Sequence, residues 1–169
     1  MITLSMNHDY AKQIFEEIRA RPYGVGYRVG EISDNCYYKG LDLLQRLGAM
    51  GYTVRGRIGE IDWRETPMPE EVLALIPVGM DSTHFYVEVL LGEEWRILDT
   101  SFQPRLAKYG FTIGGWDEGV SCFRITKLYS LEENVAYHAK WEDPVLLAAE
   151  FESAGPFLKA VNEWFGARR

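Results

Sequence analysis

The sequence predicts an α+β fold, in which helices lead, strands dominate the middle and helices return at the end. Apolar residues recur at helical spacing in residues 7–20 and 36–51. Apolar residues alternate, or nearly so, in residues 52–63 and 84–98, which is the spacing of strands. Because helices and strands are grouped and do not alternate as βαβ units, we expect an antiparallel sheet with helices packed on it.

Length and composition limit the domain organisation and the partners. The chain has 169 residues, 47% of them hydrophobic, so we expect residues 1–169 to form one domain, with a core at about 33–130 and C-terminal helices at about 143–166. The formal net charge is −7 and no run of five or six basic residues occurs, which argues against nucleic acid as a partner.

Membrane association and secretion are also not expected. No apolar stretch approaches the ~20 residues that a membrane span needs. The N-terminal residues lack the basic start and the apolar segment of a signal peptide. We therefore expect a cytoplasmic protein without a membrane partner, and the oligomeric state stays open.

Cysteine and histidine positions bear on redox state and metal binding. The two cysteines, Cys36 and Cys122, are expected to be free thiols in a reducing compartment. They and the scattered His8, His84 and His138 show no zinc-ligand spacing. A structural zinc site is therefore not expected, and no metal ligand or cofactor is assigned. The sequence leaves open whether a metal such as calcium orders the acidic loop at Asp81.

Two helices are predicted before the first strand. The first covers residues 7–20 and is followed by a glycine-rich loop. Asn35 and the polar residues before it favour the N-cap position, so a second helix should begin within a residue or two of Cys36. Gly48 or Gly51 should close this helix.

Further elements follow the second helix. A strand is predicted over Tyr52–Trp63, and a short helix over Glu70–Ile76. Ser121–Tyr129 resembles another strand. Asp143-Pro144 should start a helix, with an N-cap and a proline in the first turn. Gly155-Pro156 is expected to interrupt that helix before a last amphipathic one.

A β-hairpin is predicted over residues 84–98. The two residues Gly92 and Glu93 separate its strands, and glycine as the first loop residue suits a type II′ turn. This loop sets the cross-strand register. The resulting pairs are Leu91 with Glu94, Tyr86 with Asp99, and His84 with Ser101.

The hairpin register brings an acid close to a histidine. His84 and Asp99 become diagonal neighbours on one face, roughly 7–8 Å apart at the backbone and within side-chain reach. An acid held against an imidazole is the arrangement that orients a catalytic histidine. The sequence therefore predicts half of a nucleophilic site in the hairpin.

Cys36 is the candidate nucleophile, because the start of a helix favours a thiolate. The helix dipole supplies only ~0.3–1 kcal/mol. One pKa unit corresponds to ~1.36 kcal/mol, so the dipole alone leaves most of a thiol with a pKa of about 8.5 protonated near neutral pH. A nearby imidazolium must supply the rest, and His84 is the available one.

The segments NCYYKGLDLLQRLGAMGYTVRGRIGEI and HFYVEVLLGEEWRILDTS resemble the core of the transglutaminase-like superfamily of papain-like cysteine enzymes. That family has a cysteine at a helix start, a histidine opening an H-x-x-V-E-V strand and an aspartate ending a W-x-x-L-D-x-[ST] strand. The match covers residues 33–103 and implies a papain-like/transglutaminase-like core with Cys36, His84 and Asp99 as catalytic triad. Trp95 resembles the family's core tryptophan and is assigned to packing.

The resemblance implies a cysteine-dependent acyl-transfer enzyme that acts on peptide or carboxamide bonds of a protein or peptide substrate through a thioester. The oxyanion would meet the Cys36 N–H and one more donor, for which Asn35, Tyr27 and Trp63 are candidates. A chain this short favours a hydrolase, either a protease or an amidase. The alternatives are a protein-glutamine amine transferase (transglutaminase), an arylamine N-acetyltransferase type and an inactive transglutaminase-like binding module.

Overall fold

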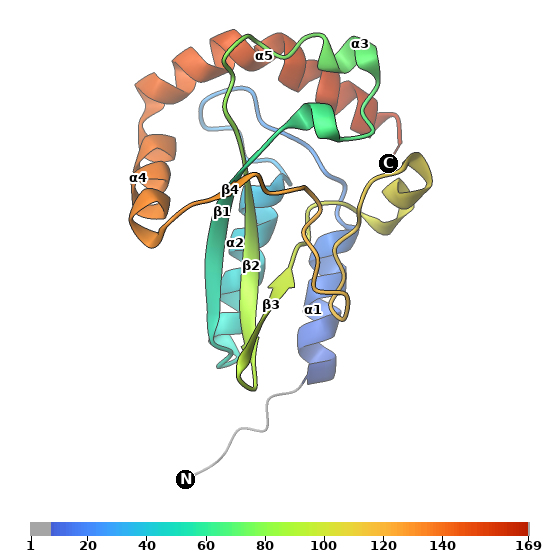
Figure 1. The fold of residues 1–169 in the computed structure, drawn as a ribbon, viewed down its shortest axis with the longest axis vertical. Helices are drawn as coiled ribbons and strands as arrows, with labels where there is room; N and C mark the ends of the chain where they lie inside the picture. Colours follow the sequence, from blue (N-terminus) through green and yellow to red (C-terminus); the bar gives the residue numbers. More distant parts are fainter. Residues whose placement is uncertain (1–7, 169) are drawn as a thin grey trace.

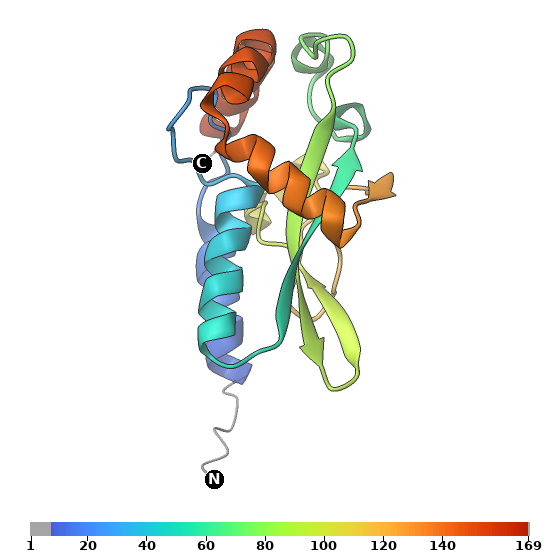
Figure 2. The ribbon, with the colours of Figure 1, turned by 90° about the vertical axis from the view of Figure 1, so that its left-hand side faces the viewer.

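The computed structural model describes residues 8–168 and shows a four-stranded antiparallel sheet with the strand order β3-β2-β1-β4. Helices α1 and α2 form a layer against one face of this sheet (Figure 1, Figure 2). The predicted α+β class and the antiparallel sheet are confirmed. The helices are α1 (His8–Ala20), α2 (Cys36–Ala49), α3 (Glu70–Leu73), α4 (Leu131–Glu142) and α5 (Pro144–Gly166), the strands are β1 (Val54–Ile61), β2 (Ser82–Leu91), β3 (Glu94–Leu98) and β4 (Lys127–Leu128), and two 3₁₀ turns span Trp63–Glu65 and Pro104–Tyr109.

Helix α2 begins at Cys36, where a helix start is predicted. The Asn35 side chain accepts a hydrogen bond from the backbone N–H three residues further on, at 3.0 Å, as an N-cap does. Gly51 follows the end of the helix with a φ of 87°, in the left-handed conformation that glycine adopts easily. In the middle of α2, a Cβ added to Gly40 would lie 2.5 Å from the Phe85 ring, so this glycine allows α2 to lie close to β2.

The hairpin of β2 and β3 has the predicted register. Leu91 pairs with Glu94, and Val87 pairs with Leu98. Gly92 has a φ of 66°, whereas Glu93 keeps a negative φ, which is the combination that a type II′ turn needs. The residue that follows β3, Asp99, therefore lies diagonally across from the beginning of β2.

Two of the predicted elements near the C-terminal half are wrong. Only Lys127–Leu128 of the predicted strand Ser121–Tyr129 pairs with β1. Helix α5 continues through Pro156 without the predicted interruption, although a proline inside a helix costs about 3 kcal/mol. Phe157 and Phe165, which follow the proline, are at most 1% exposed, so burial of this helix face offsets the cost.

Three smaller differences concern the surface. The helix predicted over Glu70–Ile76 ends at Leu73. Helix α4 has no counterpart among the predicted elements, although the Ser130 hydroxyl and the Glu133 carboxylate form a reciprocal capping box at its start, which is a sequence signal. Trp95 is 38% exposed, and the Arg55 guanidinium lies over its ring, 3.9 Å from the ring centroid. The assignment of Trp95 to packing in the core is therefore wrong.

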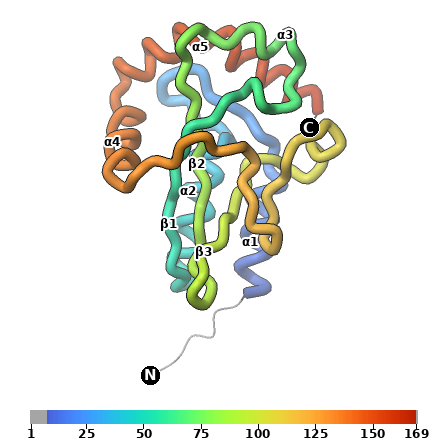
Figure 3. The backbone as a smooth tube through the Cα atoms, in the orientation of Figure 1, coloured from blue at the N-terminus to red at the C-terminus, as the bar shows by residue number. Residues whose placement is uncertain are grey.

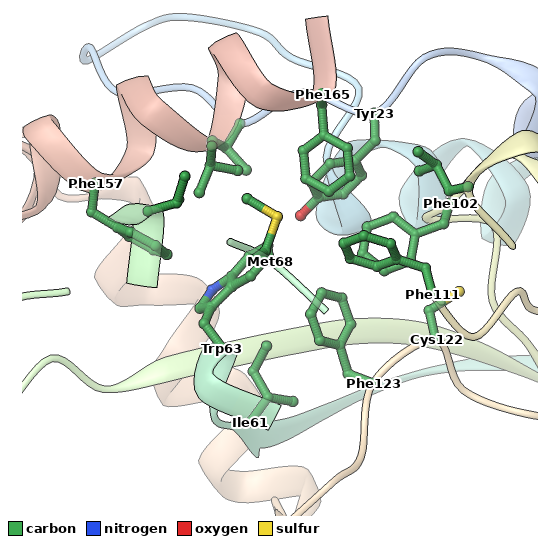
Figure 4. Close-up of a cluster of buried hydrophobic side chains, with 14 residues drawn as sticks. Tyr23, Ile61, Trp63, Met68, Phe102, Phe111, Cys122, Phe123, Phe157 and Phe165 are labelled. Atoms are coloured by element: carbon green, nitrogen blue, oxygen red, sulfur yellow. The ribbon is translucent and has the colours of Figure 1, made fainter. Parts of the chain in front are cut away.

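Two hydrophobic clusters fill the interior and meet at Cys36, which packs against both. One cluster lies between α1, α2 and the sheet. The other lies beneath α5 (Figure 4). Figure 3 shows α5 crossing the end of the sheet at which β1 ends and β2 begins, and β3 runs toward this end but stops midway along β2, at the Leu98–Val87 pair. Helix α2 begins at the same end, so the fold gathers the start of α2, the start of β2 and the end of β3 in one region.

Within residues 8–168, no helix is both long enough and apolar enough to cross a membrane.

Candidate active site

His84 and Asp99 form a buried pair. The distance from His84 Nε2 to Asp99 Oδ2 is 2.6 Å, and the side chains are 0% and 1% exposed. The histidine comes from β2 and the aspartate immediately follows β3. The contact that the hairpin register predicts is therefore present, at hydrogen-bond distance.

The Asp99 carboxylate accepts hydrogen bonds on both of its oxygens. Oδ1 accepts from the Ser101 backbone N–H at 3.0 Å and from the Ser101 hydroxyl at 2.6 Å. Oδ2 accepts from the Cys122 N–H at 2.7 Å and from the Ser121 hydroxyl at 3.3 Å, in addition to His84. Ser121 and Cys122 thus donate to Asp99, which explains why this end of the predicted strand joins no sheet.

These contacts keep Asp99 ionised although it is buried. Burial raises the pKa of the Asp99 carboxyl, but the charge of His84 and the hydrogen bonds from His84, Ser101 and Cys122 more than offset this. The net effect lowers the pKa of Asp99 below its usual range. A charged carboxylate is therefore fixed against the imidazole.

The imidazole in turn is held as a cation. Burial lowers the pKa of His84. The charge of Asp99, the hydrogen bond between His84 and Asp99 and the proximity of Cys36 outweigh this effect, and the pKa rises from 6.5 to about 10. His84 is therefore an imidazolium near neutral pH. Its Nε2 is bonded to Asp99, whereas its Nδ1 has no hydrogen-bond partner among residues 8–168. Nδ1 is the nitrogen that remains for the thiol.

Cys36 lies beside this imidazolium. Its thiol is close enough to influence the pKa of His84 and of the Tyr23 hydroxyl. Cys36 is the first residue of α2, where unsatisfied backbone N–H groups and the helix dipole favour a negative charge. The residue is half-buried and lines a cavity, so a ligand can reach it. The structure brings Cys36, His84 and Asp99 into one region.

The three candidates for the second oxyanion donor fall in different places. Asn35 lines the same cavity as Cys36, and its Oδ1 is occupied by the N-cap bond. Trp63 also lines this cavity, with its ring 5.1 Å from that of Phe123 between centroids. Tyr27 lines a separate surface hollow instead, and its N–H donates to a glutamate of its own loop. Tyr27 is thus not brought to the cavity.

Tyr23 belongs to the site, although the sequence does not single it out. Its ring lies 5.0 Å from that of Phe102 and 5.1 Å from that of Phe165, and its hydroxyl points away from α5 into the cluster (Figure 4). Burial and the proximity of Cys36 raise the pKa of this hydroxyl well above its usual value. It therefore stays protonated and can donate toward an anion on Cys36. Tyr23 is one of many aromatic residues in the loops, and no spacing distinguishes it.

Lys39 is a second residue that the sequence does not indicate. It lies in α2 one turn after Cys36, is 0% exposed and, among residues 8–168, has backbone carbonyls and no carboxylate at hydrogen-bond distance. Burial lowers its pKa to about 8. In sequence it is indistinguishable from a surface lysine of an amphipathic helix. Its Nζ donates to three backbone carbonyls, those of Arg21 at 2.8 Å, Ser101 at 2.9 Å and Arg19 at 3.2 Å.

Replacing Lys39 with Met is expected to lower the free energy of unfolding by about 2–3 kcal/mol near neutral pH, because the buried carbonyls lose their donor. The loss should grow as the pH rises from about 8 toward 10.5. In that range Lys39 is protonated in the unfolded wild type and deprotonated in the folded one. The wild type therefore gains stability as the pH rises, and the variant, which has no lysine there, does not. Urea unfolding at about pH 7 and about pH 9.5 measures this difference. Lys159→Met, at a lysine with 64% side-chain exposure, is the control, and a difference that stays constant with pH would contradict the titration of Lys39.

Comparisons with protein-family models, with curated proteins and with solved structures give no match for this chain. Among residues 8–168, no group of three or more His, Cys, Asp and Glu side chains is arranged to hold a metal ion.

Proposed function

We propose that this protein is a cysteine-dependent acyl-transfer enzyme with a papain-like/transglutaminase-like core, and that it hydrolyses peptide or carboxamide bonds. The main support is the buried His84–Asp99 pair, with one ring nitrogen left unpartnered beside the thiol at the start of α2. A buried histidine with a purely structural role normally has partners for both nitrogens. The unpartnered Nδ1 of His84 instead fits a proton exchange with Cys36.

The charge state of the pair favours an ion-pair mechanism. With a pKa of about 10, His84 holds a positive charge near neutral pH, which is what a thiolate needs beside it. The Cys36 sulfur then attacks the substrate carbonyl, a C–S bond forms, and the carbonyl electron pair moves to oxygen. The backbone N–H of Cys36 meets this oxyanion. Asn35 is the second donor that fits best, because its Oδ1 caps α2 while its NH₂ group stays available at the same cavity.

Collapse of this intermediate breaks the C–N bond. His84 Nδ1 gives its proton to the departing amine, which leaves a thioester on Cys36 and a neutral imidazole. A water molecule then gives a proton to Nδ1 as its oxygen attacks the thioester, and cleavage of the C–S bond restores the thiolate and the imidazolium. Asp99 keeps its hydrogen bond to Nε2–H throughout and fixes the tautomer.

A protein-glutamine amine transferase would use the same thioester with an amine in place of water. The carboxylate side chains that line the cavity, among them Asp81 and Glu142, favour a cationic amine there. The product distinguishes the two reactions, because a transferred amine adds its mass to the acyl group and hydrolysis yields a free acid.

Alkylation by iodoacetamide tests the proposed ion pair. Cys36 is expected to react well below about pH 8 and much faster than Cys122. Burial raises the pKa of the Cys122 thiol, and its sulfur accepts a hydrogen bond from the Gly114 N–H at 3.3 Å. The rates are measured for each cysteine by mass spectrometry of its peptide over a range of pH.

The variant His84→Gln is the control for this experiment. It should slow the alkylation of Cys36 and leave that of Cys122 unchanged, since only Cys36 depends on the imidazolium. Equal and slow labelling of both cysteines in the wild type would contradict the ion pair and favour an inactive binding module.

A further inference from the structure

A cavity of about 400 Å³ extends from Cys36 beneath the C-terminal helices. Sites for small ligands commonly have volumes of ~300–1,000 Å³. The starts of α2 and β2 and the loop at 23–35 line part of the cavity, and α4 and α5 line another part. Most of the exposed surface in the cavity is apolar. Apolar side chains that line it include Leu41, Phe85, Trp141, Leu147, Phe151 and Leu158.

The wall that α4 provides is attached to the site. The Tyr137 hydroxyl of α4 is hydrogen-bonded to the Thr83 hydroxyl, one residue before His84. The Tyr37 hydroxyl, next to Cys36, is 3.0 Å from Nδ1 of His138 in α4. These two contacts join α4 to β2, which supplies His84, and to α2, which supplies Cys36, so the cavity has a fixed position relative to the thiol.

The charges along the cavity are mostly negative. Among the described residues that line it, Arg28 is the single basic side chain, against four carboxylates. A ligand with phosphate or carboxylate groups meets like charge here, so the cavity disfavours a coenzyme A thioester as acyl donor. The carboxylates are those of Glu31, Asp81, Glu142 and Glu150, the last of which is ion-paired with Lys140 at 3.0 Å.

We propose that this cavity binds a large, uncharged apolar group of the acyl donor, such as the side chain of Phe, Leu or Met next to the scissile bond of a peptide. Burial of such a group against the apolar walls is favourable, and the carboxylates repel anionic donors. The inference depends on the proposed function, because Cys36 must be the nucleophile that meets the donor. It adds the class of substrate and assigns its recognition to α4 and α5.

The preference of Cys36 among three alkylating reagents tests this inference. Iodoacetamide, iodoacetate and N-(2-phenylethyl)iodoacetamide all form a C–S bond to the thiolate and release iodide. The phenylethyl reagent is expected to alkylate Cys36 about ten-fold or more faster than iodoacetamide and with saturation, and iodoacetate to react more slowly than iodoacetamide. Cys122 should show no such preference, because it does not line the cavity.

The failures of the two proposals are distinguishable in this experiment. Slow reaction of Cys36 with iodoacetamide itself would overturn the proposed function. Fast reaction with iodoacetamide, without any advantage of the phenylethyl reagent, would overturn the assignment of the cavity alone.

Neighbouring leucines of α5 offer a matched pair of variants. Leu147 lines the cavity, whereas Leu146 is 48% exposed and does not. Leu147→Trp should remove the preference for the phenylethyl reagent, because the larger ring fills part of the cavity. Leu146→Trp should keep it, and thermal unfolding shows that both variants are folded. A preference that survives in Leu147→Trp would also overturn the assignment.

Discussion

Replacing Cys36 with Ala is expected to abolish acyl transfer while leaving the melting temperature nearly unchanged. The sulfur is the group that forms the bond to the substrate in the proposed mechanism, so the loss should be about 10⁴-fold or more. The fold should tolerate the change, because Cys36 is half-buried at the edge of a cavity and its backbone supplies the start of α2 with either side chain. Release of amine and acid from a peptide amide with an apolar acyl group measures activity, and calorimetry measures the melting temperature.

Cys122→Ala is the matched control and should behave in the opposite way. The thiol of Cys122 is buried and accepts the Gly114 N–H, so its loss should cost about 1–2 kcal/mol of stability. Activity should remain, because the contact of Cys122 with Asp99 is made by its backbone N–H, which alanine keeps. Full activity in Cys36→Ala would end the proposal that this thiol is the nucleophile.

The parts of the site that the sequence predicts correctly depend on short stretches of chain. The register of β2 and β3 follows from a two-residue loop with glycine first, and it places His84 within reach of Asp99. The start of α2 at Cys36 follows from the capping side chain of Asn35. In both cases the deciding interaction joins residues close together in sequence, so the pattern contains the information.

The parts that the sequence does not predict depend on contacts between distant segments. Lys39 donates to carbonyls 18 and 62 positions away, and nothing in α2 itself distinguishes it from a solvated lysine. The backbone N–H of Cys122 donates to Asp99, 23 positions earlier in the sequence. Because of this contact, the segment around Cys122 does not form the predicted strand. The path of the loop before α2 decides that Tyr23 lines the cavity and that Tyr27 does not. The sequence around the two tyrosines does not distinguish them, so tertiary packing alone decides which one lines the cavity.

Asp99→Asn is expected to lower activity by about 10⁴-fold, the loss that the equivalent change causes in a serine protease triad. Asparagine has the shape of aspartate, but its amide nitrogen replaces an acceptor with a donor. In either orientation that nitrogen faces donors, which are His84 and Cys122 on one side and Ser101 on the other. The His84 pKa also loses the charge that raises it, so burial prevails and the imidazole becomes neutral near pH 7. Alkylation of Cys36 at acidic pH should therefore slow together with turnover.

Asp99→Asn should also lower the free energy of unfolding by about 3–5 kcal/mol, because it removes the charged partner of His84 from a buried ion pair. The cost should depend on pH in a defined way. The folded pKa of His84 is raised from 6.5 to about 10, so its contribution is fully present below about pH 6.5 and is lost as the pH rises toward 10. The folded pKa of Asp99 is lowered from 3.8, so its contribution is present above that value and is lost as the pH falls below it. The difference in stability between wild type and Asp99→Asn should therefore be largest between about pH 4 and about pH 6.5 and shrink on either side.

Urea unfolding of both proteins across this range measures the difference. Ser101→Ala is the matched comparison, because it removes one hydroxyl donor to Asp99 and keeps the ion pair. It should cost about 1.5–3 kcal/mol, as hydrogen bonds to charged groups do, and leave the alkylation of Cys36 at acidic pH largely intact. If Asp99→Asn instead showed a stability loss independent of pH, the His84–Asp99 contact would be a hydrogen bond between an uncharged imidazole and the acid. The imidazolium would then be absent at neutral pH, and the Cys36 thiol would lack the charge that the proposed mechanism requires beside it.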